Sequence, residues 1–185
     1  MTGYILLGVV VVLLLWAVSL YNKLVTNKNL VAEGWSGIDV QLKRRSDLVA
    51  NLVDTVKGYA AHERDVLTQV AELRSAARAL PADDIGRRAQ AEDALSLALG
   101  KLMAVAESYP DLKASGNFLA LQQELSQLES ELQMARRYYN GTVRNLNILV
   151  ESFPSNLIAG LFGFARGDFF ELTDSAERAT PAIAF

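Results

Sequence analysis

The feature that most constrains this chain is an uncharged apolar run near its N-terminus. Lys23 is the first charged side chain after Met1, and almost every residue between Tyr4 and Tyr21 is apolar. As a helix this run is about 27 Å long, which is enough to cross the hydrocarbon core of a bilayer. Tyrosines at both ends are typical of membrane interfaces. The run therefore predicts a transmembrane anchor over residues 4–21, after a short extracytoplasmic N-terminus of residues 1–3.

The residues that flank the run favour a retained anchor over a cleaved signal peptide. A signal peptide has a basic stretch before its apolar segment and small residues at a cleavage site after it, whereas this chain has Thr2-Gly3 before and Tyr21-Asn22-Lys23 after. Lys23 and Lys28 follow the run, and no basic side chain precedes it. The positive-inside rule then predicts an outside N-terminus and a cytoplasmic location for the remaining chain.

A heptad pattern of apolar residues follows the anchor and predicts one long helix. The pattern continues through Tyr59 to Ala77, and no proline occurs before Pro81, so we expect a helix over about residues 22–79. A turn near Gly58 is the alternative, and it would give four shorter helices in an up-down-up-down bundle. The apolar positions of the pattern alternate steps of four and three: Val31, Trp35, Ile38, Leu42, Val49, Leu52, Val56, Tyr59, Val66, Val70, Leu73 and Ala77.

Two further helices are expected after Pro81. One covers about residues 83–107, with Asp83 or Asp84 as its N-cap, and the other covers about 116–151 and ends before Phe153-Pro154. No stretch alternates with the period of two that is typical of strands. The predicted fold is all-α: an N-terminal transmembrane helix that continues into a long, antiparallel, coiled-coil-like helical bundle over residues 22–151.

The composition argues against most catalytic and nucleic-acid functions. Eighteen Lys and Arg stand against 21 Asp and Glu, so no basic excess is available to neutralise a nucleic-acid backbone. The chain has no cysteine and 1 histidine, so His62-Glu63 has no second histidine to complete a metalloprotease motif. A glycine-rich phosphate loop is also missing. We expect no enzyme activity, no cofactor and no bound metal.

Part of the heptad pattern is a candidate self-assembly seam. We expect the later helices to be too short to cover the membrane-proximal part of this pattern. The apolar side chains there would then need a neighbouring subunit to bury them. Arg45 falls on the same seam and must find a carboxylate or reach solvent, a role typical of residues that fix register or subunit pairing. A lipid-headgroup role is disfavoured because Arg45 lies about 36 Å beyond Tyr21 on a straight helix. The seam consists of Val31, Trp35, Ile38, Leu42 and Arg45.

A second candidate site is the apolar segment near the C-terminus. Residues 152–172 are expected to form a short Pro/Phe-rich helix, followed by a tail over 173–185. The segment is too short to cross a membrane, so it is a cap on the bundle, an interfacial helix or a contact for another subunit. A continuous first helix would carry it far from its own membrane, whereas a turn near Gly58 would return it there. Its large apolar members are Leu157, Ile158, Leu161, Phe162, Phe164, Phe169 and Phe170.

Several motifs resemble the LemA family of bacterial membrane-anchored helical proteins. The resemblance extends over nearly the whole chain, and it implies one span, a cytoplasmic helical bundle and a place in the bacterial inner membrane. It implies no established activity, although some relatives are associated with membrane remodelling in magnetosome-forming bacteria and family genes often lie near a membrane metalloprotease. The motifs are Tyr21-Asn22-Lys23-Leu24-Val25, Trp35-Ser36-Gly37-Ile38-Asp39, Asn51-Leu52-Val53-Asp54, Ala135-Arg136-Arg137-Tyr138-Tyr139-Asn140 and Phe153-Pro154-Ser155-Asn156.

Two functions fit this sequence. The first is a non-enzymatic scaffold whose copies form a homo-oligomer on the lipid bilayer and shape or organise the membrane. The second is an adaptor or regulator that docks onto another membrane protein, such as a membrane protease, through the apolar segment or through the tail at residues 176–185. The size of the protein in its membrane separates the two, because a scaffold forms large self-assemblies whereas an adaptor stays small and depends on its partner.

Overall fold

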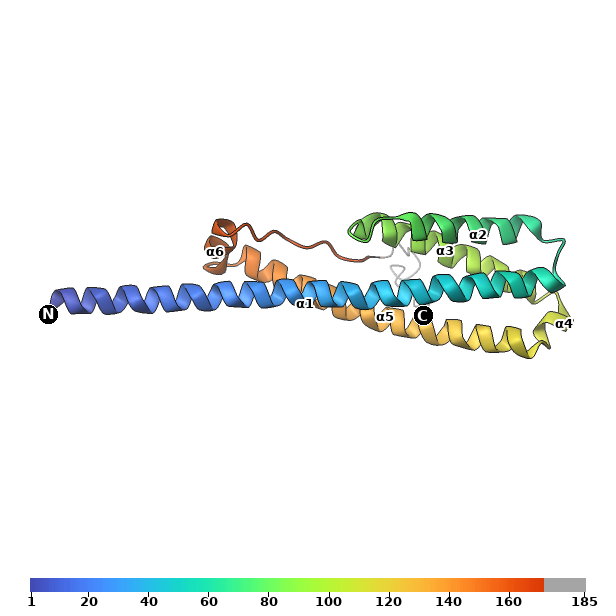
Figure 1. Cartoon of the computed structure of the whole chain (residues 1–185), viewed down its shortest axis with the longest axis horizontal. Coiled ribbons are helices and arrows are strands. Elements are labelled where there is room, and N and C mark those ends of the chain that lie inside the picture. The colour runs from blue at the N-terminus through green and yellow to red at the C-terminus, as the bar shows by residue number, and fades with distance from the viewer. Residues whose placement is uncertain (172–185) are drawn as a thin grey trace, which may run out of the picture. The chain divides into compact units, whose positions relative to one another are not determined.

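The computed structural model describes residues 1–171, and within this range helices are the only regular secondary structure (Figure 1). This confirms the all-α prediction. The expected tail at 173–185, including the proposed docking peptide at 176–185, lies outside the described residues. In chain order the helices are α1 (Thr2–Tyr59), α2 (Arg64–Ala79), α3 (Ile85–Ala106), α4 (Pro110–Lys113), α5 (Gly116–Glu151) and α6 (Ser155–Leu161).

The prediction of one continuous helix over 22–79 was wrong. α1 ends at Tyr59, and the chain turns at residues 60–63 before α2 begins. The heptad pattern could not reveal this break because apolar residues on both sides of the turn pack into the same core, with Val56 and Val70 both fully buried. The sequence offered one weak local signal, Gly58, which weakens the last turn of α1. In the structure Tyr59 is 47% exposed although it belongs to the pattern.

The other two helix predictions were correct to within about two residues. α5 covers the predicted range of 116–151. α3 begins at Ile85, and the Asp84 side chain accepts a hydrogen bond of 3.1 Å from the backbone N–H of Arg87. This bond satisfies one of the free N–H groups at the helix start, so Asp84 is the cap that the sequence predicted as one of two choices.

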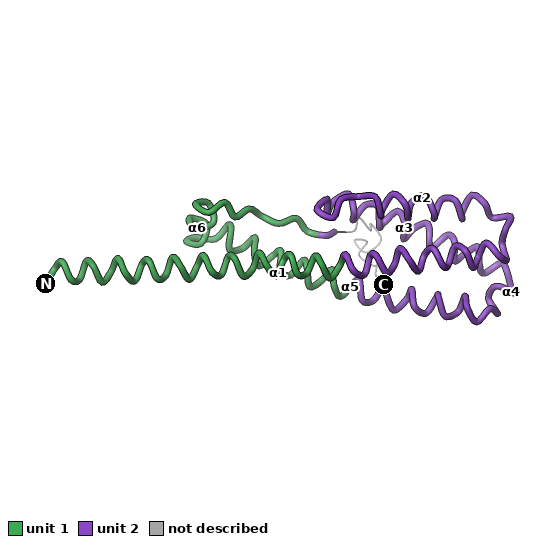
Figure 2. Tube along the Cα trace, in the orientation of Figure 1, with its two compact units in different colours: residues 1–38, 134–169 green, residues 39–133, 170–185 purple. Residues whose placement is uncertain are grey.

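The chain divides into two compact units, which Figure 2 shows in different colours. Unit 1 contains residues 1–38 and 134–169. Unit 2 contains residues 39–133 and, at the end of the described range, Phe170 and Glu171. Each unit is therefore built from parts of the chain that are far apart in sequence.

Unit 2 is an up-down-up-down arrangement of the end of α1, α2, α3 and the first part of α5. The α1 segment and α5 run antiparallel, because Arg44 pairs with Glu131 at 3.0 Å near one end, and Asn117 donates a hydrogen bond to Thr55 at the other. This confirms the alternative topology with a turn near Gly58. The buried core of the unit includes Val49, Leu52, Val56, Val70, Leu95, Leu102, Leu112 and Phe118.

Unit 1 is formed by the beginning of α1, the end of α5 and α6. The rings of Trp35 and Tyr139 meet with centroids 5.5 Å apart. Burial and the nearby carboxylate of Asp168 raise the pKa of Tyr139 to about 12, so its hydroxyl stays protonated at neutral pH. That hydroxyl donates a 2.8 Å hydrogen bond to the backbone carbonyl of Asp168. Asn147 exchanges two hydrogen bonds with the backbone of Gly167 and holds the same returning segment against α5.

The first part of α1 is long and apolar enough to cross a membrane. None of the 18 residues in its most apolar stretch is buried, so no other part of the described residues covers this stretch. A lone apolar helix with this exposure is typical of a membrane anchor rather than of a core helix.

Candidate functional site

Buried charges of unit 2 form one candidate site, where α1, α3 and α5 meet. Arg45 is only 3% exposed, and its guanidinium lies 3.1 Å from a carboxylate oxygen of Glu92 and 2.9 Å from one of Glu129. The guanidinium also donates a 2.6 Å hydrogen bond to the hydroxyl of Ser96. The sequence left two possibilities for Arg45, a carboxylate partner or a route to solvent, and these ion pairs show that the first is correct.

A second group of charges lies near Arg45 in unit 2. Arg88 pairs with Asp39 at 2.9 Å, and Lys43 pairs with the other oxygen of Asp39 at 2.6 Å. Asp39 and Lys43 lie one turn apart on α1, a spacing that favours such an ion pair. Because Arg88 comes from α3, its contact with Asp39 is a second ionic link between α1 and α3.

These surroundings shift the pKa values of Glu92 and Asp39 in opposite directions. Burial raises the pKa of Glu92, and the attraction of Arg45 and Arg88 offsets only part of this effect. Burial also works to raise the pKa of Asp39, but hydrogen bonds and charges from Lys43 and Arg88 outweigh it and hold that pKa below its ordinary value. Glu92 is thus the costlier of the two carboxylates to keep ionised.

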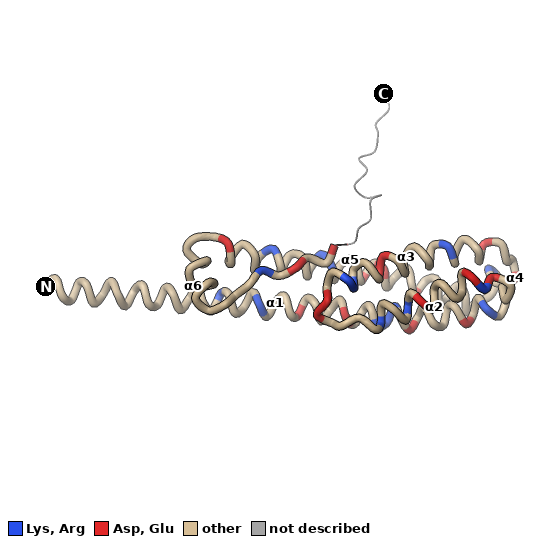
Figure 3. Tube along the Cα trace, turned by 90° about the horizontal axis from the view of Figure 1, so that it is seen from above, with Lys and Arg blue, Asp and Glu red and all other residues tan. Residues whose placement is uncertain are grey.

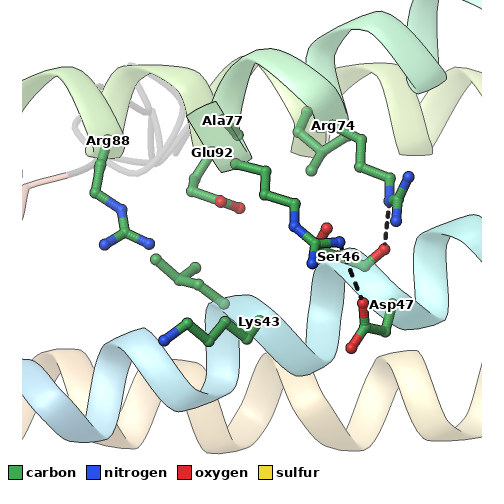
Figure 4. A pocket seen from close by; sticks show the side chains of 10 residues that line it. Lys43, Ser46, Asp47, Arg74, Ala77, Arg88 and Glu92 are labelled. Atoms are coloured by element: carbon green, nitrogen blue, oxygen red, sulfur yellow. Dashed lines mark hydrogen bonds and ion pairs between the residues drawn. The ribbon is translucent and has the colours of Figure 1, made fainter. Parts of the chain in front are cut away.

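A cavity of about 290 Å³ adjoins the two charge groups (Figure 4). Several of its charged side chains already have protein partners, since the Nε of Arg74 donates to the carbonyl of Ser46 at 2.6 Å and Arg78 approaches Asp47 at 3.7 Å. Among the described residues, no three histidine or carboxylate side chains are grouped as metal ligands. The cavity is lined by Leu42, Lys43, Ser46, Asp47, Arg74, Ala77, Arg78, Arg88, Glu92 and Leu95.

The expected self-assembly seam is covered within the chain itself. Ile38, Leu42 and Arg45 are at most 3% exposed, and Val31 and Trp35 are half-buried against neighbouring side chains. The premise that these residues need a neighbouring subunit was therefore wrong. The reason is the length of α5, which packs along both the membrane-proximal and the later part of α1.

The apolar C-terminal segment is divided by the structure into buried and exposed residues. Phe170 is buried and Phe169 is half-buried, while Ile158 and Phe164 pack on a cluster formed by Leu24, Leu146 and Ala159. In contrast, Leu157, Leu161 and Phe162 are 57–76% exposed. The segment is therefore a cap on one side and an open apolar surface on the other.

The exposed part of this segment lies next to the end of the membrane anchor. The ring of Tyr21 is 4.8 Å from that of Phe162 and 5.8 Å from that of Phe164. Both contacts are within unit 1, and Figure 1 shows α6 beside α1. The continuous first helix that would carry the segment far from its membrane is not formed, because the chain turns back at residues 60–63, as in the alternative with a turn near Gly58.

Sequence reasoning missed the partners of the buried charges. Glu92 and Glu129 lie 47 and 84 positions from Arg45, and Arg88 lies 49 positions from Asp39, so periodicity gives no sign of these contacts. A weak signal was available for Glu92, because it lies three residues before Leu95 on the apolar side of α3. A charged residue on the apolar face of a helix needs a buried partner.

Comparisons with known proteins agree with the resemblance found in the motifs. The model of the LemA family matches residues 34–185. Magnetosome protein MamQ 2 of Paramagnetospirillum magneticum is 26% identical over 187 residues, which cover 88% of this chain and 68% of that protein. Magnetosome protein MamQ of Magnetospirillum gryphiswaldense is 23% identical over the same shares of both chains. Protein LemA of Metamycoplasma hominis is 28% identical over 75% of this chain and 63% of that protein.

The family match includes both units of the helical bundle and most of the elements described above. Together with the exposed apolar helix at the N-terminus, it makes this chain a membrane-anchored helical protein. The match covers well over half of the sequence, and the chain therefore belongs to the LemA family.

Proposed function

We propose that this chain is a non-enzymatic scaffold that self-assembles in the bacterial inner membrane and shapes or organises it. The observation that carries the proposal is an exposed apolar face on α5 in unit 1, formed by Met134, Tyr138 and Ile148, which are 48–54% exposed. The three residues lie on one side of the helix by their spacing. We call this surface the α5 outer face.

Anchoring in a membrane favours association through such a face. Copies that share a bilayer are confined to two dimensions, so a modest apolar contact suffices to bring them together. Exposed large apolar side chains that recur along one side of a helix are candidates for an interaction surface. The resemblance to relatives associated with membrane remodelling supports the same role for this chain. The internal pairing of Arg45, Arg88 and Asp39 supports a structural rather than a catalytic use of the buried charges.

Charges on the α5 outer face are expected to break the assembly. In the double variant Met134→Glu and Tyr138→Glu, association would bury carboxylates without partners, which costs several kcal/mol per site. To measure this, membrane patches that contain the protein are extracted with a polymer, and the size of the protein assembly in them is determined. The parent protein should form large assemblies, and the variant should form a much smaller species. The matched control is Leu97→Glu, because Leu97 is 72% exposed but belongs to unit 2.

The same measurement separates the proposal from its alternative. If the double variant stays as large as the parent while its helicity is unchanged, the α5 outer face is not the assembly interface. If the parent protein itself is small and changes size only with a second membrane protein, the adaptor function is correct instead. A membrane protease is one such partner, as the resemblance implied.

The orientation in the membrane can be tested with single cysteines, because the chain contains none. We expect a cysteine at Gly3 to react with a membrane-impermeant maleimide in intact spheroplasts, and a cysteine at Leu97 to react only after lysis. The physical reason is the positive-inside rule acting on Lys23 and Lys28. Labelling at Leu97 before lysis would overturn both the orientation and the cytoplasmic location of the bundle.

A further inference from the structure

We propose that unit 1 carries a second membrane-contact site, seated in the interface of the same bilayer that α1 crosses. The site is the exposed apolar surface of α6 and its flanks, which we call the collar: Phe153, Leu157, Leu161 and Phe162. The ligand is the lipid bilayer itself. The inference needs only the membrane anchor, so it is independent of self-assembly through the α5 outer face.

The depth of the collar follows from its contact with Tyr21. Tyr21 comes directly after the apolar run, and Lys23 follows two positions later, so Tyr21 marks the level at which the span leaves the hydrocarbon. The ring of Phe162 lies 4.8 Å from that of Tyr21 and must share its depth. The bilayer around the span therefore reaches the collar without any movement of the chain.

The collar has the surface that an interfacial element requires. Its four side chains are 57–78% exposed, which is costly if they meet only water. The opposite side of α6 is fixed to the protein, since Ser155 and Ala159 are at most 5% exposed. The helix is thus held in place by its inner face and presents its outer face, with Leu157 and Leu161 one turn apart, to the surroundings.

Charged residues lie outside the collar, as expected for a surface that contacts lipid. No charged residue occurs from Ser152 to Ala165, and the stretch is closed by Glu151 and Arg166, which pair at 2.8 Å. In Figure 3 α6 itself is drawn entirely in the tan of residues other than Lys, Arg, Asp and Glu. Lys28 lies beyond this uncharged region, with its Nζ 6.0 Å from the centre of the Phe164 ring. Apolar and aromatic groups at the interface with a lysine on the aqueous side are the arrangement that favours membrane binding.

The collar also explains how a single span could act on membrane shape. It adds apolar volume beside α1 at one end of the span, so it enters one leaflet and leaves the other unchanged. Insertion into one leaflet makes membrane binding sensitive to curvature. Because α6 is fixed to α1 and α5, it also restrains the angle at which the span leaves the bilayer.

Quenching of tryptophan fluorescence by brominated lipid tests the collar in the full-length protein. The two native tryptophans are first changed to phenylalanine (Trp16→Phe and Trp35→Phe), and Leu161→Trp is then added. In phosphatidylcholine and phosphatidylglycerol vesicles with bromine on the upper acyl chain, this variant should lose roughly half or more of its emission because its ring lies at the interface. The matched control is Tyr138→Trp in the same background.

The control position is similar in exposure but not in depth. Tyr138 is 48% exposed and packs against Gly34, which lies about 20 Å beyond Tyr21 along α1. The control should therefore keep its emission in brominated vesicles. Leu157→Trp provides a second collar position, so the test remains decisive even if the Leu161→Trp variant fails to fold.

Two outcomes would overturn the proposal. Equal quenching of the Leu161→Trp and Tyr138→Trp variants would show that the collar does not lie nearer to lipid than the control. Blue-shifted emission of the Leu161→Trp variant without quenching would show that a neighbouring protein surface, and not lipid, covers the collar. Neither outcome would bear on the proposed self-assembly through the α5 outer face, because that proposal is tested by the size of the assembly and not by lipid contact.

Discussion

Replacing Arg45 with alanine should lower the free energy of unfolding by about 3–5 kcal/mol, because the change leaves a buried carboxylate without its ion-pair partner. Glu92 is 7% exposed and cannot turn to solvent, whereas Glu129 has a side chain that is 44% exposed and can. Most of the cost therefore comes from Glu92. Urea unfolding followed by helical circular dichroism, with the full-length protein in detergent, measures the difference.

The cost of the Arg45→Ala change should depend on pH in a defined direction. Burial already raises the pKa of Glu92, so this group favours folding below its ordinary pKa near 4.5, and its contribution is lost as the pH rises through the raised value. Removal of Arg45 takes away an attraction that opposes this rise, and the pKa increases further. The variant should thus lose more stability relative to the parent at about pH 7.5 than at about pH 5.

The neighbouring arginine is a matched control for the buried pair. Arg44 pairs with Glu131 at 3.0 Å, but its side chain is 58% exposed, so Arg44→Ala should cost no more than about 1 kcal/mol. If the Arg45→Ala and Arg44→Ala variants lose the same stability, the Arg45 cluster does not link the three helices as described. A second check is the pair Arg45→Met with Glu92→Leu, which should recover much of the loss because no buried carboxylate is left without a partner and Glu129 can turn to solvent.

The sequence predicted helices well where caps and prolines define them and poorly where packing decides. Asp84 and Phe153-Pro154 are local signals, and the predicted ends of α3 and α5 lie close to the observed ones. The turn after Tyr59 has neither a cap nor a proline, and Gly58 is only a weak signal for it. A continuous helix and a hairpin bury the same heptad positions, so the choice between them depends on contacts distant in sequence, such as the hydrogen bond from Tyr109 to Glu63.

For the candidate sites too, local features could be predicted from the sequence, whereas contacts between residues distant in sequence could not. From the sequence, Arg45 needed a carboxylate or a route to solvent, and the Phe-rich segment needed a surface to cover it. Their surroundings could not be derived, because Glu92 and Tyr21 reach them only through the folded arrangement of the helices. The misplaced turn also led to the wrong expectation for the seam, as a chain that folds back at residues 60–63 brings α5 along the whole membrane-proximal stretch of α1.

Two glycines one turn apart on α1 should respond to leucine with opposite signs. A Cβ at Gly34 would lie 3.1 Å from the Cα of Tyr139, and a backbone atom cannot move aside as a side chain can. Gly34→Leu should therefore force α1 and α5 apart within unit 1 and lower the free energy of unfolding by about 1–3 kcal/mol. A Cβ at Gly37 meets nothing within 4 Å. Gly37→Leu should raise stability by about 0.5–1 kcal/mol, because leucine favours a helix more than glycine does.

The comparison isolates close helix packing from helix propensity, since both changes introduce the same residue into the same helix. Urea unfolding gives the two free energies, and the fluorescence of Trp35 reports whether its ring has left Tyr139, 5.5 Å away in the parent protein. Stabilisation of both variants would mean that α1 and α5 do not approach closely at Gly34. Loss of stability only at Gly34, together with a change in Trp35 emission, is the result expected if the small residue is what allows α5 to cover the membrane-proximal part of α1.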